Sequence, residues 1–184
     1  MILLGRGSAV LAVIDVQERL LAAFPEPVRG AVVRNVSTLV ESAGVLGVPT
    51  LVSEQYPKGL GPTVAEVRDR LGAEFAPIEK IVFSCGRSPE FRAALDATGR
   101  RDVVVCGVES HVCVLQTAVD LLTDGYRVFV PADAVRSRRD LDWERSLALM
   151  DKAGVTVGTT EMFLFQLLER AGTDEFKKIS KLVK

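Results

Sequence analysis

Short apolar runs alternate with helix-like patterns along this chain, and this alternation limits the folds that it can adopt. Between the runs, apolar residues recur at every third or fourth position, as they do on a helix that rests one face on a sheet. Unbroken runs such as VLAVI and VVV are typical of parallel strands, because helices cover both faces of a parallel sheet. The runs lie at 10–16, 50–53, 78–83, 103–107, 127–130 and 155–159, and the helical patterns at 31–46, 63–71, 89–98, 112–122, 140–153 and 161–171.

The sequence therefore predicts an α/β fold, a three-layer αβα sandwich with a six-stranded, mainly parallel, Rossmann-like sheet. With 184 residues, of which 48% are hydrophobic, the chain can build one such domain over residues 1–184 and has no room for a second. The apolar run at 9–16 is interrupted by Asp15 and is far shorter than a membrane span of about 20 residues. We therefore expect neither a transmembrane helix nor a signal peptide.

Charge and cysteine content narrow the function further. The formal charge is −1, from 23 basic and 24 acidic residues, so we expect no binding to nucleic acid or to an anionic membrane, and a small-molecule substrate instead. Three cysteines without a CxxC pair indicate neither a disulfide framework nor a zinc site and favour a cytoplasmic location. The only histidine is His111, which excludes sites with two imidazoles and favours chemistry without a metal or other cofactor.

Cys113 is the strongest candidate nucleophile. It follows the apolar run at 103–107 and a short polar loop, and it lies where a helical pattern begins, so the sequence places it at a strand-to-helix corner. Free N–H groups at a helix start stabilise a thiolate and can hold an oxyanion, so we expect a lowered thiol pKa and a cysteine hydrolase. Cys106 lies within a buried run, and Cys85 follows a strand without a helix start. His111 is two residues from Cys113, does not face it on a helix, and is expected near the pocket mouth.

Two further residues stand in unusual positions for charged groups. Asp15 ends the first apolar run, where it could cap the following helix or act as a general base. Lys80 lies within an apolar run, where it could pair with a buried carboxylate such as Asp15 or extend to water from an edge strand.

The irregular stretch at 54–62 follows a strand directly, at the sheet edge that carries ligand sites in open α/β folds. It could close over a pocket or contact a neighbouring subunit. Candidate pocket residues, chosen by loop position, are Gln17, Gln55, Phe83, Ser84 and Ser110.

Asp15 in VIDVQ, the buried Lys80 and the segment CGVESHVCV together resemble the isochorismatase-like hydrolase superfamily of cysteine hydrolases, which includes nicotinamidases and N-carbamoyl amidohydrolases. The resemblance spans essentially the whole chain. Within the superfamily, four further segments are similar to the isochorismatase domain-containing group: EQYPKGLGPTV, FSCGRSPEF, TTEMFLF and FKKISKLVK.

The resemblance implies a catalytic triad of Asp15, Lys80 and Cys113. It also implies a cis peptide bond between Val108 and Glu109, which turns the backbone N–H groups of Glu109 and Cys113 toward one oxyanion. Metal-dependent nicotinamidases carry an aspartate and paired histidines between the triad aspartate and lysine, and no histidine lies between Asp15 and Lys80 here. The retained cysteine favours a covalent route.

The expected function is metal-independent hydrolysis of a small-molecule amide or related carbonyl C–N bond through a thioester. One alternative is hydrolysis of an isochorismate-like vinyl ether, with Asp15 as the acid and no covalent step. Another is a scaffold or interaction protein with little turnover, for which the basic tail at 173–184 could be a docking segment. That tail more commonly forms a helix that packs Phe176, Ile179 and Leu182 on its own domain or on a neighbouring subunit, and we expect a homo-oligomer.

Overall fold

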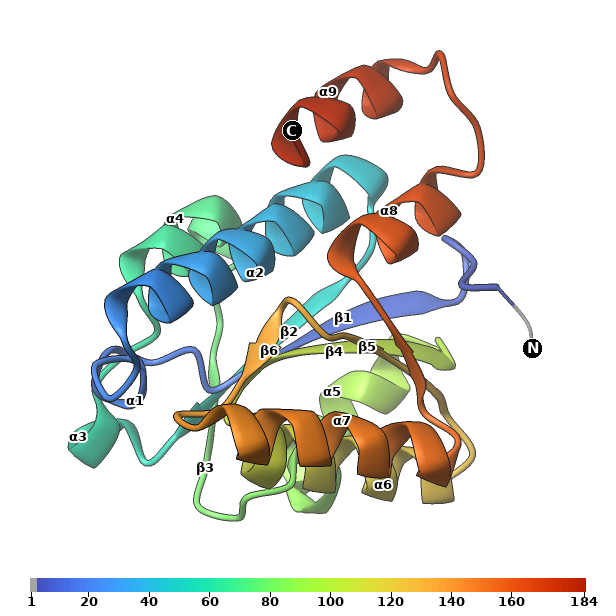
Figure 1. The fold of residues 1–184 in the computed structure, drawn as a ribbon. Helices are drawn as coiled ribbons and strands as arrows, with labels where there is room; N and C mark the ends of the chain where they lie inside the picture. Colours follow the sequence, from blue (N-terminus) through green and yellow to red (C-terminus); the bar gives the residue numbers. More distant parts are fainter. Residues whose placement is uncertain (1–2) are drawn as a thin grey trace.

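The computed structural model describes residues 3–184 and confirms the α/β sandwich, with a central sheet of seven strands rather than six (Figure 1). Strand order is β3-β2-β1-β4-β5-β7, all pairs are parallel, and β6 pairs with β4 beyond the end of β5. The sequence analysis missed β6, because two residues are too few to show a pattern. The strands are β1 Ala9–Ile14, β2 Thr50–Gln55, β3 Ile78–Lys80, β4 Asp102–Val108, β5 Arg127–Pro131, β6 Val135–Arg136 and β7 Thr156–Gly158.

Helices cover both faces of the sheet, which explains the unbroken apolar runs. Alternate residues of β1 enter different cores: Leu11 and Val13 pack toward α2 and α8, whereas Val10 and Ala12 pack toward α5, α6 and α7 (Figure 1). The helices are α1 Glu18–Leu21, α2 Glu26–Leu46, α3 Pro57–Leu60, α4 Ala65–Leu71, α5 Pro89–Ala97, α6 Leu115–Thr123, α7 Asp140–Ala153, α8 Thr160–Leu168 and α9 Asp174–Leu182. No helix within residues 3–184 is both long and apolar enough to cross a membrane.

Several boundaries differ from the predicted ones near the carboxyl ends of the strands. The run predicted as a strand over 78–83 is a strand only as far as Lys80. The helix predicted from 112 begins at Leu115, and a π-helical turn over Ser110–Val114 precedes it. Both differences arise where the chain leaves regular structure to place polar groups at the sheet edge.

The stretch at 54–62 is more ordered than its composition indicates. Strand β2 extends to Gln55, and α3 forms a single turn immediately after it. The Gln17 side-chain amide donates to the carbonyl groups of Gln55 and Gly61, at 3.1 and 2.6 Å. The buried Glu54 accepts hydrogen bonds from the backbone and hydroxyl of Thr63, both at 2.7 Å. These contacts fix both ends of the stretch to the sheet edge.

The basic tail packs on its own chain. Thr173 caps α9 by accepting a hydrogen bond from the Phe176 N–H, and Ile179 is fully buried. The ring of Phe176 meets that of Phe165 on α8 edge to face, with 6.1 Å between centroids. Helix α9 therefore lies against α2 and α8 (Figure 1), and its lysines are exposed to solvent.

Gly107 lies where β4 passes close against β1. Its φ is +114°, and a Cβ built there would lie 2.1 Å from the Ile14 carbonyl oxygen. Only glycine fits this backbone conformation and this space. The carboxyl ends of the two central strands therefore meet without a side chain between them.

Substitution of this glycine is expected to be costly. Gly107→Ala should lower the free energy of unfolding by at least about 3 kcal/mol. The new methyl group collides with the backbone of Ile14, and the alanine must also adopt a positive φ. Gly99→Ala is a matched control, since Gly99 also has a positive φ, +65°, but nothing lies within 4 Å of its added Cβ. That variant should lose about 1 kcal/mol in chemical denaturation. Equal losses would contradict the close approach.

Candidate active site

A buried ion pair joins the ends of β1 and β3. Lys80 Nζ lies 2.7 Å from Asp15 Oδ2, and the two side chains are 1% and 0% exposed. Strand β2 lies between these strands, so the lysine side chain reaches across it. Lys80 is therefore both on an edge strand and paired with a carboxylate. The helix-capping interpretation of Asp15 is wrong, because α1 has no side-chain cap.

Neutral groups of neighbouring residues complete the hydrogen bonding of the pair. Ser53 Oγ donates to Asp15 Oδ1 at 2.7 Å, while Lys80 Nζ donates to Gln55 Oε1 at 2.8 Å and to the Phe83 carbonyl at 3.1 Å. Sequence reasoning missed Ser53. The feature that could have identified Ser53 is its position on β2, the strand next to β1. There it pairs in register with Ile14, the residue before Asp15.

Cys113 lies on the π-helical turn next to this pair, with 6% of its surface exposed. Burial raises the pKa of its thiol, and the negative charge of Asp15 and a hydrogen bond with it raise the pKa further, against the opposing charge of Lys80. The expected lowering of the thiol pKa is therefore wrong, because burial and the carboxylate outweigh the favourable N–H groups. At neutral pH the sulfur keeps its proton.

Lys80 stays charged. Burial is the largest single influence and lowers its pKa, but the charges of Asp15, Cys85 and Cys113 and the hydrogen bond with Asp15 together raise it more, so the net pKa lies above its usual value. A positive charge is thus held against the Asp15 carboxylate, next to a protonated thiol.

The other two thiols are more deeply buried than Cys113. Cys85 is 0% exposed, and burial together with the Asp15 charge raises its pKa to about 12. Cys106 is also 0% exposed, within the core, and burial raises its pKa. Cys113 is therefore the thiol that a reagent can reach most readily.

The turn before Cys113 leaves a backbone donor unused. The Val108–Glu109 peptide bond is cis. Among residues 3–184, the N–H group of Glu109 donates to no protein acceptor, and that of Cys113 donates to none outside its own helical turn. His111 lies on the same turn, and its Nδ1 is 2.8 Å from Ser137 Oγ rather than paired with the thiol. It stands outside the Asp15, Lys80 and Cys113 cluster.

The five candidate pocket residues have different surroundings. The Gln55 side chain and the Phe83 carbonyl contact Lys80 directly. The Gln17 amide is fully buried and holds the 54–62 stretch, and Ser84 Oγ accepts from the Gly86 N–H. Ser110 is buried against Ser137 and Ser146, so only Gln55 and Phe83 adjoin the ion pair.

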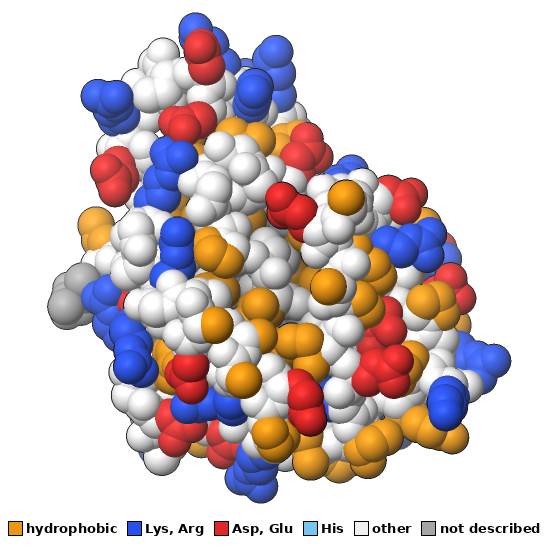
Figure 2. All heavy atoms as spheres, turned by 180° about the vertical axis from the view of Figure 1, so that it is seen from behind, with side chains coloured by type: hydrophobic (Ala, Val, Ile, Leu, Met, Phe, Trp, Pro, Cys, Tyr) orange, Lys and Arg blue, Asp and Glu red, His pale blue; other side chains and the backbone are white. Residues whose placement is uncertain are grey.

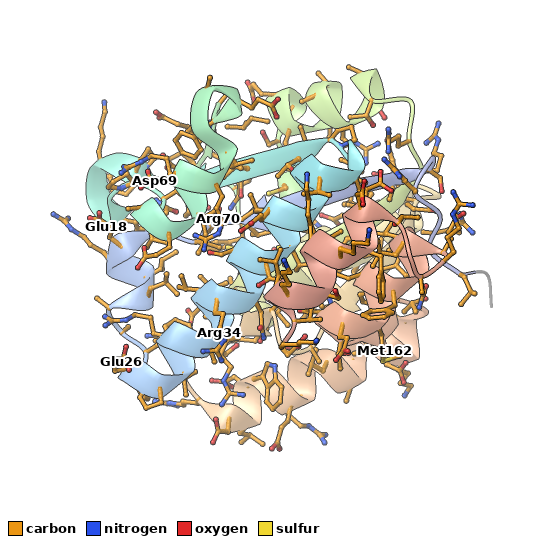
Figure 3. The ribbon with its side chains drawn as sticks, turned by 90° about the horizontal axis from the view of Figure 1, so that it is seen from above. Glu18, Glu26, Arg34, Asp69, Arg70 and Met162 are labelled. Atoms are coloured by element: carbon orange, nitrogen blue, oxygen red, sulfur yellow. The ribbon has the colours of Figure 1, made fainter. Side chains whose placement is uncertain are left out.

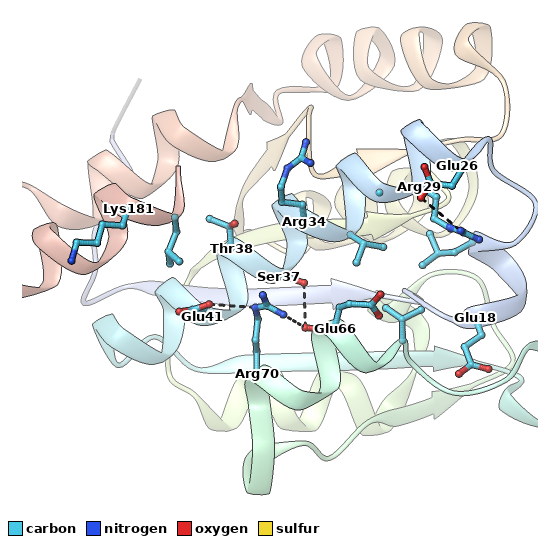
Figure 4. A pocket seen from close by; sticks show the side chains of 15 residues that line it. Glu18, Glu26, Arg29, Arg34, Ser37, Thr38, Glu41, Glu66, Arg70 and Lys181 are labelled. Atoms are coloured by element: carbon cyan, nitrogen blue, oxygen red, sulfur yellow. Dashed lines mark hydrogen bonds and ion pairs between the residues drawn. The ribbon is translucent and has the colours of Figure 1, made fainter. Parts of the chain in front are cut away.

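A large cavity lies elsewhere. About 700 Å³ opens along α2 between α4 and α9, and none of Asp15, Lys80 and Cys113 lines it. Seen from above, Arg34 on α2 and Arg70 on α4 mark its two sides (Figure 3). In close-up, Arg70 pairs with Glu41 at 3.3 Å and donates to the Glu66 carbonyl at 2.5 Å (Figure 4). A second cavity, of about 400 Å³, lies against β3 and includes Lys80 in its lining.

The buried ion pair should behave as one unit in stability measurements. Lys80→Met leaves a buried carboxylate without its counter-charge and should lower the free energy of unfolding by about 3–5 kcal/mol. The double variant Asp15→Asn/Lys80→Met should lose clearly less than the sum of the single losses. As a control, Arg70→Gln at the exposed Arg70–Glu41 pair should cost at most about 1 kcal/mol. Additive losses at the buried pair would contradict its coupling.

Comparisons with known proteins place this chain in a family. The model of the isochorismatase domain matches residues 8–162. Isochorismatase domain-containing protein 2 of Homo sapiens is 39% identical over 183 residues, which are 97% of this chain and 84% of that protein.

Comparison with solved structures gives similar folds. The MAR1 ribonuclease of Caenorhabditis elegans aligns with a TM-score of 0.91 and 32% identity, covering 99% of this chain and 92% of that chain. The YcaC gene product of Escherichia coli, an octameric hydrolase of unknown specificity, also reaches 0.91 but at 22% identity, over 99% of this chain and 91% of its own, and shows the same fold. The chain belongs to the isochorismatase domain family.

Proposed function

We propose that this protein is a metal-independent cysteine hydrolase that cleaves a carbonyl C–N bond of a small molecule through a thioester. The observation that carries the proposal is the buried Asp15–Lys80 ion pair beside the Cys113 thiol, since the charge of Asp15 and a hydrogen bond with it raise the pKa of that thiol. A protonated nucleophile needs a base in contact with it, and this arrangement provides one.

In the first half-reaction, Asp15 accepts the Cys113 proton while the sulfur attacks the carbonyl carbon. The raised thiol pKa means that this proton moves during attack rather than before it. The N–H group of Glu109, which donates to no protein acceptor among residues 3–184, and that of Cys113 hold the oxyanion. When the C–N bond breaks, Asp15 returns the proton to the departing nitrogen, and the acyl group stays on the sulfur.

In the second half-reaction, water cleaves the thioester. Asp15 takes a proton from the water as it attacks the acyl carbon, and the same N–H groups hold the new oxyanion. Breaking of the C–S bond releases the acid, and the proton returns from Asp15 to Cys113. Lys80 stays positively charged through the cycle and fixes the carboxylate in place.

Burial supports a small substrate. Asp15 is 0% exposed, Lys80 5% and Cys113 6%, so a reacting group must enter a narrow opening at the sheet edge. A polynucleotide of the kind named for the nematode relative would have to bring its backbone to these buried groups. A small amide can reach them without rearranging the strand ends.

We also propose a homo-oligomer in a reducing compartment such as the cytoplasm. Ile81, Val82 and Phe83 are 72%, 42% and 53% exposed, an unusual run of bare apolar side chains, and apolar side chains gather along the lower edge of the molecule in Figure 2. The octameric YcaC neighbour supports association. Three free cysteines support the reducing compartment.

The proposed function predicts a covalent intermediate on Cys113. Incubation with small amides, followed by mass spectrometry of the quenched protein, should detect an acyl group on Cys113 together with released ammonia or amine. Cys113→Ala should lower hydrolysis at least about 100-fold, because the acceptor of the acyl group is lost. Cys106→Ala, which removes a thiol from the core, should keep the activity. If Cys113→Ala keeps full activity while Asp15→Asn loses it, the vinyl ether route with Asp15 as acid is correct instead.

The proposed function also predicts that removing the Asp15 charge raises the reactivity of the Cys113 thiol but lowers turnover. Because the Asp15 charge and hydrogen bond raise the Cys113 pKa, Asp15→Asn should lower that pKa and speed alkylation by iodoacetamide at pH 8. Hydrolysis should fall by about 100-fold or more, since the proton acceptor is gone. Peptide mapping across pH gives the alkylation rates. Slower alkylation of Cys113 in this variant would contradict the assigned contact.

A further inference from the structure

Two consecutive residues after β6, Ser137 and Arg138, hold the turn that carries the N–H groups of Glu109 and Cys113. Arg138 donates to Glu109 Oε1 twice, from its backbone N–H at 3.2 Å and from Nε at 2.9 Å. Ser137 Oγ accepts from the backbone N–H of His111 at 3.3 Å and also contacts His111 Nδ1 and Ser110 Oγ. Each residue of the turn from Glu109 to His111 is therefore tied to Ser137 or Arg138.

These contacts are anchored deep in the fold. Ser137 is 1% exposed, Ser110 0% and Ser146 2%. Ser146 Oγ on α7 lies 2.9 Å from Ser110 Oγ and 2.8 Å from the Trp143 carbonyl, so the hydroxyl cluster is fixed to that helix. Strand β6 holds the other end, because Val135 and Arg136 pair with Gly107 and Val108. The turn is thus held from the sheet and from α7 together.

The Arg138 contact also concerns charge. Glu109 carries a carboxylate on the residue whose N–H would hold the oxyanion, and its side chain is only 11% exposed. An unpaired negative charge this close would oppose the charge that develops on the substrate oxygen. The guanidinium of Arg138 offsets it while leaving the backbone N–H of Glu109 free.

We propose that Ser137 and Arg138 are positioning residues for the oxyanion hole, an inference that rests on the proposed function. Ser137 fixes the direction of the turn, so that the N–H groups of Glu109 and Cys113 converge on one point. Arg138 fixes the Glu109 side chain and offsets its charge. Neither residue contacts the triad side chains, so their effect falls on oxyanion stabilisation and leaves the reactivity of the thiol unchanged.

Two reactions of Cys113 separate these effects. Acylation by p-nitrophenyl acetate passes through a tetrahedral oxyanion, whereas alkylation by iodoacetamide is a displacement at carbon that forms none. Mass spectrometry of the modified Cys113 peptide gives both rates for each variant. Ser137→Ala and Arg138→Gln should slow acylation at least about tenfold and change alkylation less than about twofold. Arg139→Gln, at the next and exposed position, is the matched control and should change neither rate.

Substitution of Glu109 tests whether Arg138 acts by offsetting the charge of that carboxylate. In a Glu109→Gln background, Arg138→Gln should slow acylation far less than in the parent, because no carboxylate remains to be offset. Removal of the buried Ser137 hydroxyl lowers stability, so thermal melts accompany each rate, and Arg138→Gln, at a side chain that is 57% exposed, tests the proposal without a buried cavity.

The outcomes distinguish the role of Ser137 and Arg138 from the proposed function itself. If both rates fall together, or neither changes, Ser137 and Arg138 do not position the oxyanion hole, while acylation of Cys113 in the parent still supports the proposed function. If the parent gives no acylated Cys113 although iodoacetamide alkylates it, the proposed function fails, and the oxyanion role of the turn fails with it.

Discussion

The ion pair between Asp15 and Lys80 is the interaction on which the rest of the site depends. Two charges with almost no solvent contact are stable only when each has its counter-charge and its remaining hydrogen bonds satisfied. The ends of β1, β2 and β3 supply these groups, and the carbonyl of Phe83 closes the set. The early end of β3 follows from this need, because the chain must turn after Lys80 to bring that carbonyl back onto the ammonium.

The pair also determines how the thiol can react. A lysine next to a cysteine usually stabilises the thiolate, but here the lysine charge is largely matched by Asp15, and burial favours the neutral sulfur. The thiol is therefore protonated at rest, beside a carboxylate that is paired with Lys80. Under the proposed function, this arrangement couples activation of the thiol to the arrival of a carbonyl group, because Asp15 takes the proton only as the sulfur attacks.

Sequence alone predicted the layers and the pairing of Asp15 with Lys80, and it singled out Cys113, because these features leave local signals, whereas a triad of the three was implied by the family resemblance. Asp15 and Lys80 interrupt apolar runs, and Cys113 follows a strand at a break in pattern. The sign of the thiol pKa shift could not be predicted, since it depends on burial produced by distant segments. Ser137 and Arg138 were missed for the same reason: their importance lies in contacts with a turn almost thirty residues earlier in the chain, and serine and arginine in a polar loop look ordinary.

Two halves of the fold thus meet at Cys113. The half that holds the Asp15–Lys80 pair is built from β1, β2 and β3, and the half that carries the turn from Glu109 to Cys113 is built from β4, β6 and the start of α7. Gly107 joins them, because the absence of a side chain lets β4 pass against the Ile14 carbonyl, one residue before Asp15. Both halves are filled by groups that bond to one another, so the proposed function leaves recognition of the rest of a substrate to side chains outside them. The half-exposed Tyr56, which lines the cavity of about 400 Å³ together with Lys80, stands in the right place for that contact.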